Sequence, residues 1–340
     1  MLYNLHLLRV IAALGVVYFH TTSTSGLKLS WDVGSRGVDI FFVISGFIIA
    51  FIGSAKQKQF FRRRLIRVVP FYWAATLVVF AVVTVKPEVF HTATNSVKHL
   101  FYSLAFLPHP DPHGELEPTL TLGWSLNYEM FFYVVFALSL LVAHKRAPIV
   151  SVLVIVAVVV ALYLSGNKSV AAQFYGRPIV LEFCYGIIAF YLFRAITAHK
   201  DALAGNIALK GLLLVLAIGS LVFIAVGEHY WGDVVPRQWI AGIPSFVLVL
   251  SALLLEKLFG LFSSNKTIFE LGEASYIIYL IHPYIVFTVL RVFAKNAEHW
   301  SAPPQALLIL ALLALTSGLA WLIHTYFEKP VMGFLRAKLT

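Results

Sequence analysis

Two ionisable side chains in the first apolar segment of the chain point to acid–base chemistry inside a membrane. The segment reads RVIAALGVVYFH and carries Arg9 and His20, eleven residues apart. In a helix this spacing makes about three turns, so both side chains lie on one face with about 16 Å of rise between them. A histidine has an unperturbed pKa of about 6.5 and can take and return a proton near neutral pH. Because charges inside membrane segments are unfavourable and commonly functional, this pattern predicts a site reached from both sides of the membrane.

Carboxylates at a similar depth give the histidine candidate partners. Asp39 lies about one turn into the next apolar segment, GVDIFFVISGFII, and Glu129 lies about two turns into GWSLNYEMFFY. A carboxylate can orient an imidazole for general acid–base catalysis. We therefore predict His20, Asp39 and Glu129 as the catalytic group. For each residue taken alone, a structural polar contact is the alternative.

A run of basic residues, KQKQFFRRRLIR at 56–67, predicts a site for a phosphate-bearing ligand on the cytoplasmic side. Arg64 and Arg67 are three residues apart, so they share a helical face, and arginine forks match phosphate oxygens. An anionic-lipid site and a positive-inside anchor are the alternatives. The residues that we predict for this ligand are Arg9, Arg62, Arg63, Arg64 and Arg67.

A late apolar segment, EASYIIYLIHPYIVF, places a second histidine in mid-membrane. Tyr276, Tyr279 and His282 are spaced by three and share a helical face. Pro283 kinks a helix and frees a backbone carbonyl near residue 278. Two interpretations stay open for these side chains, namely hydrogen bonding between helices and a role at the site.

Other polar residues complete the candidate set. Glu328 ends the last predicted helix, where a carboxylate is unfavourable for the helix dipole, so we predict a cationic partner for it among Arg62 to Arg67. The side chains that we expect to bind the acceptor or to serve as structural polar contacts are Arg36, Trp124, Ser125, Tyr276 and His282.

The composition determines which elements position these residues. Of 340 residues, 60% are hydrophobic and only 12% are charged, and the mean hydropathy is +0.84. A soluble domain cannot bury so much apolar surface, because the charged share is about half the usual one. The sequence therefore predicts an all-α, polytopic membrane protein with a single membrane-embedded domain over residues 1–340. The net charge of +10 serves as topology information and not as a sign of nucleic-acid binding.

Ten apolar segments are long enough to cross a bilayer as helices, which takes roughly 20 residues. Of the 26 Lys and Arg residues, 16 lie in the connections on one side and 9 in those on the other, so both termini are predicted to be cytoplasmic and His20 lies near the outer surface. The segments are 4–22, 37–54, 68–86, 123–143, 148–165, 178–196, 209–227, 237–255, 273–294 and 304–327.

One outer connection, 87–122, is unusually long. Its residues 96–107 are predicted to form a short interfacial or re-entrant helix, and 108–118 is irregular because its prolines break regular hydrogen bonding. Long loops often bind ligands, so we expect this loop to influence the acceptor. The aromatic stretch 228–239 either anchors the chain at the membrane interface or forms a platform for a sugar ring.

Other reaction classes lack their motifs in this sequence. There is no P-loop, no GxSxG elbow and no HExxH pair. The single cysteine, Cys184, excludes a disulfide framework and a cysteine metal cluster. We therefore expect no metal and no bound cofactor.

Taken together, the motifs resemble the acyltransferase-3 family of bacterial integral-membrane O-acyltransferases. The matching stretches are LRVIAALGVVYFH, GVDIFFVISGFII, FFRRRLIRVVPFYW, GWSLNYEMFFY, SYIIYLIHP and YFEKP, in the family's order. They cover nearly the whole chain. Within the family the chain is most similar to the exopolysaccharide-production acetyltransferases of the ExoZ type.

The resemblance implies an activity and assigns roles. Arg9 and His20 match the family's Arg/Lys-x10-His, and Arg64 and Arg67 match its Arg-x-x-Arg. Asp39 matches the acidic residue of the family's second helix, and Glu129 matches the glutamate of its Trp-Ser-Leu segment. The implied reaction moves an acyl group, expected to be acetyl, from cytoplasmic acyl-CoA to a hydroxyl of a surface polysaccharide or its lipid-linked precursor. The implied location is the bacterial inner membrane, with membrane lipids as neighbours and no nucleic-acid partner.

A transporter or flippase of a glycan or lipid intermediate is the alternative, because ten helices and buried charges also fit that class. No inverted repeat and few broken helix pairs are visible, which argues against it. A structural membrane subunit is a third possibility, and it would tolerate changes at His20 and Glu129.

Overall fold

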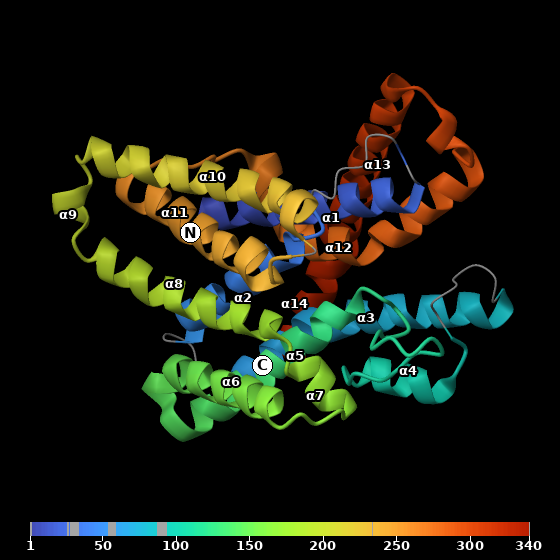
Figure 1. The fold of residues 1–340 in the computed structure, drawn as a ribbon, viewed down its shortest axis with the longest axis horizontal. Helices are drawn as coiled ribbons and strands as arrows, with labels where there is room; N and C mark the ends of the chain where they lie inside the picture. The colour runs from blue at the N-terminus through green and yellow to red at the C-terminus, as the bar shows by residue number, and fades with distance from the viewer. Residues whose placement is uncertain are drawn as a thin grey trace. The chain divides into compact units, whose positions relative to one another are not determined.

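The computed structural model describes residues 2–25, 27, 34–53, 59–86, 94–232 and 234–339, which form helices and the turns between them (Figure 1). No strand occurs among these residues, and the predicted all-α class is confirmed. The α-helices are α1 (Tyr3–Ser25), α2 (Gly37–Gly53), α3 (Phe60–Val85), α4 (Val97–Leu104), α5 (Gly123–Ala143), α6 (Ala147–Leu164), α7 (Val170–Tyr175), α8 (Leu181–Thr197), α9 (Lys200–Leu203), α10 (Ile207–Trp231), α11 (Ile243–Phe259), α12 (Lys266–Phe293), α13 (Ala302–Ile323) and α14 (Lys329–Leu339).

Eight stretches of helix in the described part of the chain are long and apolar enough to cross a membrane. One of them, Gly123–Leu164, contains both α5 and α6, and α2 adds a shorter apolar helix. Each of the ten predicted segments therefore contains a helix, and the chain is a multi-pass membrane protein. Its orientation across the membrane stays a prediction.

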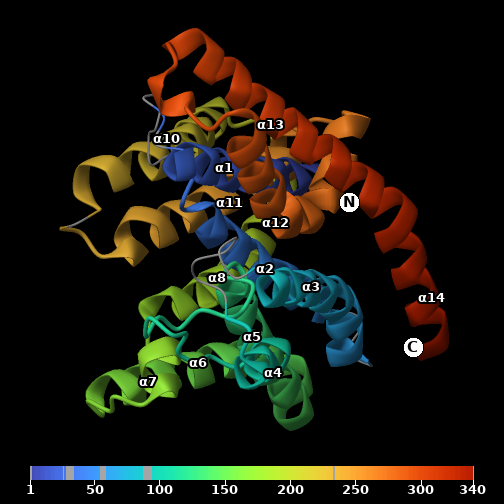
Figure 2. The ribbon, with the colours of Figure 1, turned by 90° about the vertical axis from the view of Figure 1, so that its right-hand side faces the viewer.

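Three helix boundaries differ from the predicted ones. Helix α3 begins at Phe60, so the arginines at 62–67 lie in its first two turns and not in a connection. Helix α12 begins at Lys266, seven residues before the predicted start. After α13 the chain continues through a π-helical turn, η6 (His324–Glu328), into α14, so Glu328 does not end the last helix (Figure 2). The reason is that each added residue gains a backbone hydrogen bond, which extends a helix beyond its apolar stretch.

The helices gather into two compact units, each made of two stretches of chain. The first unit comprises Met1–Ile48 and Tyr185–Lys329, and the second comprises Ile49–Cys184 and Pro330–Thr340. The two units alternate along the sequence, so neither is a contiguous stretch. Each is described by itself below.

In the first unit, α1 packs most extensively against α12. The His6 ring lies 4.2 Å from that of Phe269, and Arg9 bonds Ser275 further along α12. The His20 ring lies next to His282, further along again. Because contacts advance in the same direction along both helices, α1 and α12 are parallel, as the predicted topology requires.

The N-terminus of α1 is capped by a carboxylate from α11. Glu256 accepts hydrogen bonds from the backbone N–H groups of Tyr3 and Asn4, at 2.8 and 2.7 Å. The Asn4 side-chain amide donates to the carbonyls of Ala252 and Leu261. A negative side chain at a helix N-terminus satisfies free N–H groups and complements the helix dipole. This cap fixes where α1 begins, and therefore the level at which Arg9 and His20 lie.

A close approach between α1 and α2 depends on glycine. A Cβ atom at Gly37 would lie 2.4 Å from the Ala12 carbonyl oxygen. Gly34, in the turn before α2, has φ +103°, and a Cβ there would lie 2.0 Å from the Gly15 carbonyl oxygen. Small residues let membrane helices approach closely. These contacts hold the start of α2, and with it Asp39, against α1.

In the second unit, α3 and α5 run antiparallel. The rings of Phe60 and Phe136 lie 4.9 Å apart near one end, and a Cβ atom at Gly123 would touch the Tyr72 hydroxyl near the other. Tyr128 of α5 stacks on Phe174 at 4.1 Å and donates to its carbonyl. Buried aromatic side chains therefore form much of this core.

The long outer connection follows its prediction where it is described, from residue 94. Helix α4 lies within the predicted 96–107, and 108–118 contains turns but no helix. The carboxylate of Asp111 accepts from the N–H groups of His113 and Glu115, which holds the turn. Residues 87–93 lie outside the described part of the chain.

Candidate active site

The two predicted histidines of the first unit lie side by side. His20 comes from α1 and His282 from α12, and their ring centroids are 5.1 Å apart with a 38° angle between the ring planes. Phe19 packs edge-on against His20, with the ring centroids 5.2 Å apart. His282 is fully buried, while His20 is half-buried. The structure thus brings together two groups able to carry protons.

Pro283 explains the orientation of His282. A proline has no N–H, so the carbonyl four residues earlier, that of Tyr279, loses its helical hydrogen bond. His282 Nδ1 lies 2.8 Å from this carbonyl oxygen. The predicted free carbonyl therefore exists, one residue later than expected, and the histidine next to the proline satisfies it.

Asp39 has a different partner from the one expected. Both of its oxygens accept from Arg237, with Nε to Oδ1 at 2.9 Å and Nη2 to Oδ2 at 2.6 Å. Asp39 is fully buried, and no hydrogen bond joins it to His20 in the described structure, while its predicted place in the catalytic group stays a prediction. A buried carboxylate needs a paired charge, and a two-pronged arginine pair is the strongest kind available.

Arg237 is the residue that sequence reasoning missed. It lies in the stretch 228–239, which the sequence marks mainly for its aromatic residues. The predicted topology could have identified it, because it places Arg237 on the outer side of the membrane. The carboxylate at the predicted start of α2 lies on the same side. Only the fold shows that the two meet.

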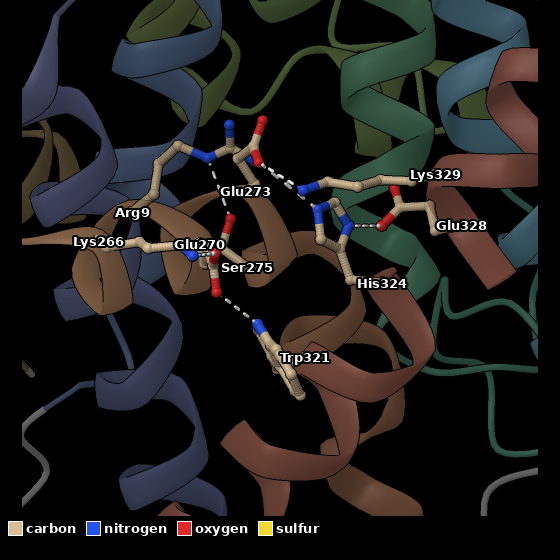
Figure 3. Close-up of polar contacts among 9 residues, drawn as sticks. All are labelled: Arg9, Lys266, Glu270, Glu273, Ser275, Trp321, His324, Glu328 and Lys329. Carbon is tan, nitrogen blue, oxygen red and sulfur yellow. Dashed lines mark hydrogen bonds and ion pairs between the residues drawn. The ribbon is translucent and has the colours of Figure 1, made fainter. Parts of the chain in front are cut away.

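Arg9 is held inside the helix pair. Its Nε donates to Ser275 Oγ at 3.0 Å, and Ser275 is fully buried on α12 (Figure 3). Helix α12 thus contacts both site residues of α1: Ser275 bonds Arg9, and His282 lies beside His20. The site residues of α1 share one neighbouring helix.

A network of charged groups lies where α12 meets the end of α13 (Figure 3). Glu273 pairs with Lys329 at 2.9 Å and lies 3.9 Å from His324 Nε2. His324 Nδ1 lies 2.5 Å from a Glu328 oxygen, and both side chains are buried. Glu328 is therefore partnered by His324 in the first unit, and its predicted pairing with Arg62 to Arg67 stays a prediction, because those arginines belong to the second unit. The contact with His324 is local, since residues four apart meet on a helix.

A second carboxylate near this network also has partners. Glu270 accepts a hydrogen bond from Trp321 Nε1 at 2.7 Å and pairs with Lys266 at 3.7 Å (Figure 3). The π turn η6 carries His324 and Glu328. Such turns are frequent at functional sites, because the extra residue redirects side chains. Here the turn directs both groups into a buried, paired cluster.

In the second unit, Glu129 accepts a hydrogen bond from the Tyr133 hydroxyl. The Arg64 guanidinium lies over the rings of Phe60 and Tyr133, 5.7 and 5.9 Å from their centroids. Tyr133 thus connects the predicted donor-binding arginine with the predicted catalytic glutamate. The grouping of Glu129 with His20 stays a prediction, because the two residues belong to different units.

The arginines of α3 fall into two sets. Arg62 and Arg63 are exposed, and Arg62 donates to the carbonyl of Leu339 in α14. Arg64 and Arg67 are half-buried, and their spacing of three residues in α3 confirms that they share a face. The lysines of the basic run before residue 59 lie outside the described residues.

The remaining candidates have more ordinary surroundings. Ser125 Oγ donates to the Leu122 carbonyl in the first turn of α5, and Trp124 packs edge-on against Tyr128. Arg36 lies in the turn before α2 and its carbonyl accepts from the Asp39 N–H. Tyr276 is half-buried on α12.

The outer connection holds titratable groups in less polar surroundings than water. His99 is buried, and its burial, followed by the neighbouring His109, lowers its pKa; the two Nδ1 atoms are 3.3 Å apart. Burial, followed by repulsion from Asp111 and Glu115, raises the pKa of Glu117. Both shifts favour the neutral forms of these side chains. Within the described residues, no group of three His, Cys, Asp or Glu side chains has the arrangement of a metal site.

These observations define a multi-pass helical membrane protein with proton-carrying groups and arginines among its apolar helices. Comparison with known proteins gives the class a name. The sequence model of the acyltransferase domain, Acyl_transf_3, matches residues 2–325, and the chain belongs to this family. It is a membrane O-acyltransferase.

Several curated relatives support the assignment. The chain is 34% identical over 329 residues to the exopolysaccharide production protein ExoZ of Rhizobium meliloti, covering 94% of this chain and 96% of that one. It is 25% identical to the O-acetyltransferase OatA of Staphylococcus aureus, covering 95% of this chain and 56% of OatA. It is also 25% identical to the acyltransferase MdmB of Streptomyces mycarofaciens, covering 89% and 82%. No solved structure matches.

Proposed function

We propose that this O-acyltransferase moves an acyl group from cytoplasmic acyl-CoA to a hydroxyl of an exported polysaccharide or its lipid-linked precursor. The acyl group that we propose is acetyl. The observation that carries the proposal is the position of His20 on α1, half-buried beside His282 and on the same helix as Arg9. The name of the relative ExoZ, an exopolysaccharide production protein, supports a polysaccharide acceptor. The name of OatA, an O-acetyltransferase, supports an acetyl group and a hydroxyl.

In the proposed reaction, His20 acts as general base. It takes the proton of the acceptor hydroxyl while the oxygen attacks the thioester carbonyl. The carbon–sulfur bond then breaks, and the CoA thiolate leaves and receives the proton, so that no proton is gained or lost overall. A histidine near neutral pH suits both proton transfers. A variant of this route acylates His20 first and passes the group on.

The donor site proposed here uses the arginines of α3 for the phosphates of CoA. Arg64 and Arg67 share the half-buried face of α3, and Arg62 and Arg63 are exposed for a ligand from the aqueous side. Arginine binds phosphate through two parallel hydrogen bonds. Arg9 then faces the thioester end of the donor in this proposal.

The proposed roles of the carboxylates follow their partners. Asp39 holds Arg237 through two hydrogen bonds and thereby acts on the acceptor side through that arginine. Glu129, bonded to Tyr133, is proposed to orient the acceptor or His20. The proposed setting is the bacterial inner membrane, with membrane lipids around the helices, no nucleic-acid partner, and acyl-CoA as co-substrate without a bound cofactor.

The test is transfer of labelled acetyl from acetyl-CoA to cell-surface glycan, in membranes carrying either wild type or His20→Ala. We expect label in the glycan with wild type and a loss of about 10²- to 10⁴-fold with the variant, the range for a general base. Both proteins must be present in the membrane in equal amounts. Equal label with both would overturn the role of His20. Movement of acceptor across liposomes without consumption of acetyl-CoA would indicate a transporter.

The donor site is tested by Arg64→Gln with Arg67→Gln. We expect the KM for acyl-CoA to rise at least about 10-fold, because hydrogen bonds to charged groups are lost. A matched control changes two exposed basic residues in the turn just before α6, Lys145→Gln with Arg146→Gln, and leaves KM unchanged. An unchanged KM in the first variant means that these arginines bind lipid and not donor.

A further inference from the structure

We propose that His282 is a positioning residue for His20, through a hydrogen bond that its Nε2 accepts from the His20 ring. The inference rests on the proposed function of His20 and goes beyond it. Neither residue type nor spacing assigns this role, because the sequence leaves open whether His282 only joins helices. Three observations on His282 and its neighbour His20 favour a role at the site over a purely structural contact between helices.

The first observation fixes which nitrogen of His282 carries the proton. Nδ1 lies 2.8 Å from the Tyr279 carbonyl oxygen. A carbonyl only accepts hydrogen bonds, so Nδ1 must be the protonated nitrogen. In a neutral imidazole the other nitrogen then carries a free lone pair, so His282 Nε2 is an acceptor. Pro283 causes this arrangement, because it removes the N–H that would otherwise bond the Tyr279 carbonyl.

The second observation concerns the surroundings of that lone pair. His282 is fully buried, and its Nε2 has no hydrogen-bond partner among the described residues. Buried polar atoms are nearly always hydrogen-bonded, so an unpaired one calls for a donor. If His282 served only to satisfy the helix, its Nδ1 contact would suffice, and the buried acceptor would be left unexplained.

The third observation identifies the donor. The ring centroids of His20 and His282 are 5.1 Å apart, and no hydrogen bond of the His20 ring is formed with any other described residue. The histidine χ2 torsion is broad, so rotation of the His20 ring turns an N–H toward the neighbouring lone pair. Asp39, the expected partner of His20, is occupied by Arg237.

The bond would act during the reaction. When His20 takes the proton of the acceptor hydroxyl, it becomes a cation with two N–H donors. One holds the abstracted proton for return to the CoA thiolate, and the other donates to His282 Nε2. His282 keeps its own proton on Nδ1 throughout. It stabilises and orients the imidazolium, as a carboxylate does in other histidine-based sites.

The test separates this role from satisfaction of the Tyr279 carbonyl. His282→Leu removes both functions of the ring. Pro283→Ala returns an N–H to the Tyr279 carbonyl, so the double variant restores the helix but not the acceptor. We expect the double variant to insert and resist heat like wild type, while kcat falls about 10- to 100-fold with KM for acyl-CoA unchanged, as expected for lost orientation. Recovery of wild-type kcat in the double variant would overturn the proposal.

Two conservative variants give a second readout. His282→Asn keeps a donor near the Nδ1 position and loses the acceptor, whereas His282→Gln places an amide near the Nε2 position. We expect His282→Gln to retain more of kcat than His282→Asn. The opposite order shows a purely structural role. If wild-type membranes transfer no acyl group, the proposed function itself fails. If they transfer it and His282→Asn retains more of kcat than His282→Gln, only the present inference fails.

Discussion

The two halves of α12 differ in how their polar side chains are paired. In the first half, Glu270 has Trp321 and Lys266, and Glu273 has Lys329 (Figure 3). In the second half, His282 satisfies one carbonyl and leaves its second nitrogen unpaired beside His20. Paired groups in a network stabilise one structure, whereas the unpaired acceptor of His282 is the atom that the proposed hydrogen bond from His20 would satisfy.

The same contrast distinguishes the histidines of the first unit. His324 is buried and lies 2.5 Å from Glu328. The His20 ring packs against the rings of Phe19 and His282 and forms no hydrogen bond with the described residues. The carboxylate of Glu328 thus holds the His324 ring, whereas in our proposal a neutral imidazole, that of His282, holds the His20 ring. The two histidines therefore differ in the partners that the fold gives them, and not only in their position in the chain.

The largest effect on stability is expected at the Asp39–Arg237 pair. Arg237→Ala leaves a fully buried carboxylate without its partner, and breaking a buried pair this way costs about 3–5 kcal/mol. Thermal unfolding in detergent measures the loss. The double variant Asp39→Asn with Arg237→Ala should be more stable than Arg237→Ala alone, because no charge is then left unpaired. A stability equal to wild type in Arg237→Ala would show that the pair is not buried in the membrane protein.

A smaller effect is expected at the paired end of α12. Glu328→Gln removes the charge from the buried contact with His324 and should lower unfolding stability by about 1–3 kcal/mol, with the rate of transfer kept within about twofold of wild type. The matched control is Lys329→Ala, which breaks a partly exposed pair with Glu273 and should cost about 0–1 kcal/mol. A large loss of transfer at unchanged stability in Glu328→Gln would place this network in the reaction and erase the contrast between the two halves of α12.

The sequence determined the class of fold because hydropathy and length are local properties. Each of the ten apolar segments contains a helix, and α4 lies where the outer connection predicts it. It also determined the catalytic histidine candidate, because Arg9 and His20 share one helix and their spacing is fixed by helical geometry. The free carbonyl before Pro283 follows from the same local rule.

Only the tertiary structure decided which residues meet. Asp39 and Arg237 are 198 positions apart, and His20 and His282 lie on different helices, so no local pattern could pair them. The contact of Glu328 with His324, one turn away on the same stretch of helix, was also not predicted. Partner choice inside a membrane depends on which helices pack together, because every buried charge takes the nearest opposite group that packing provides.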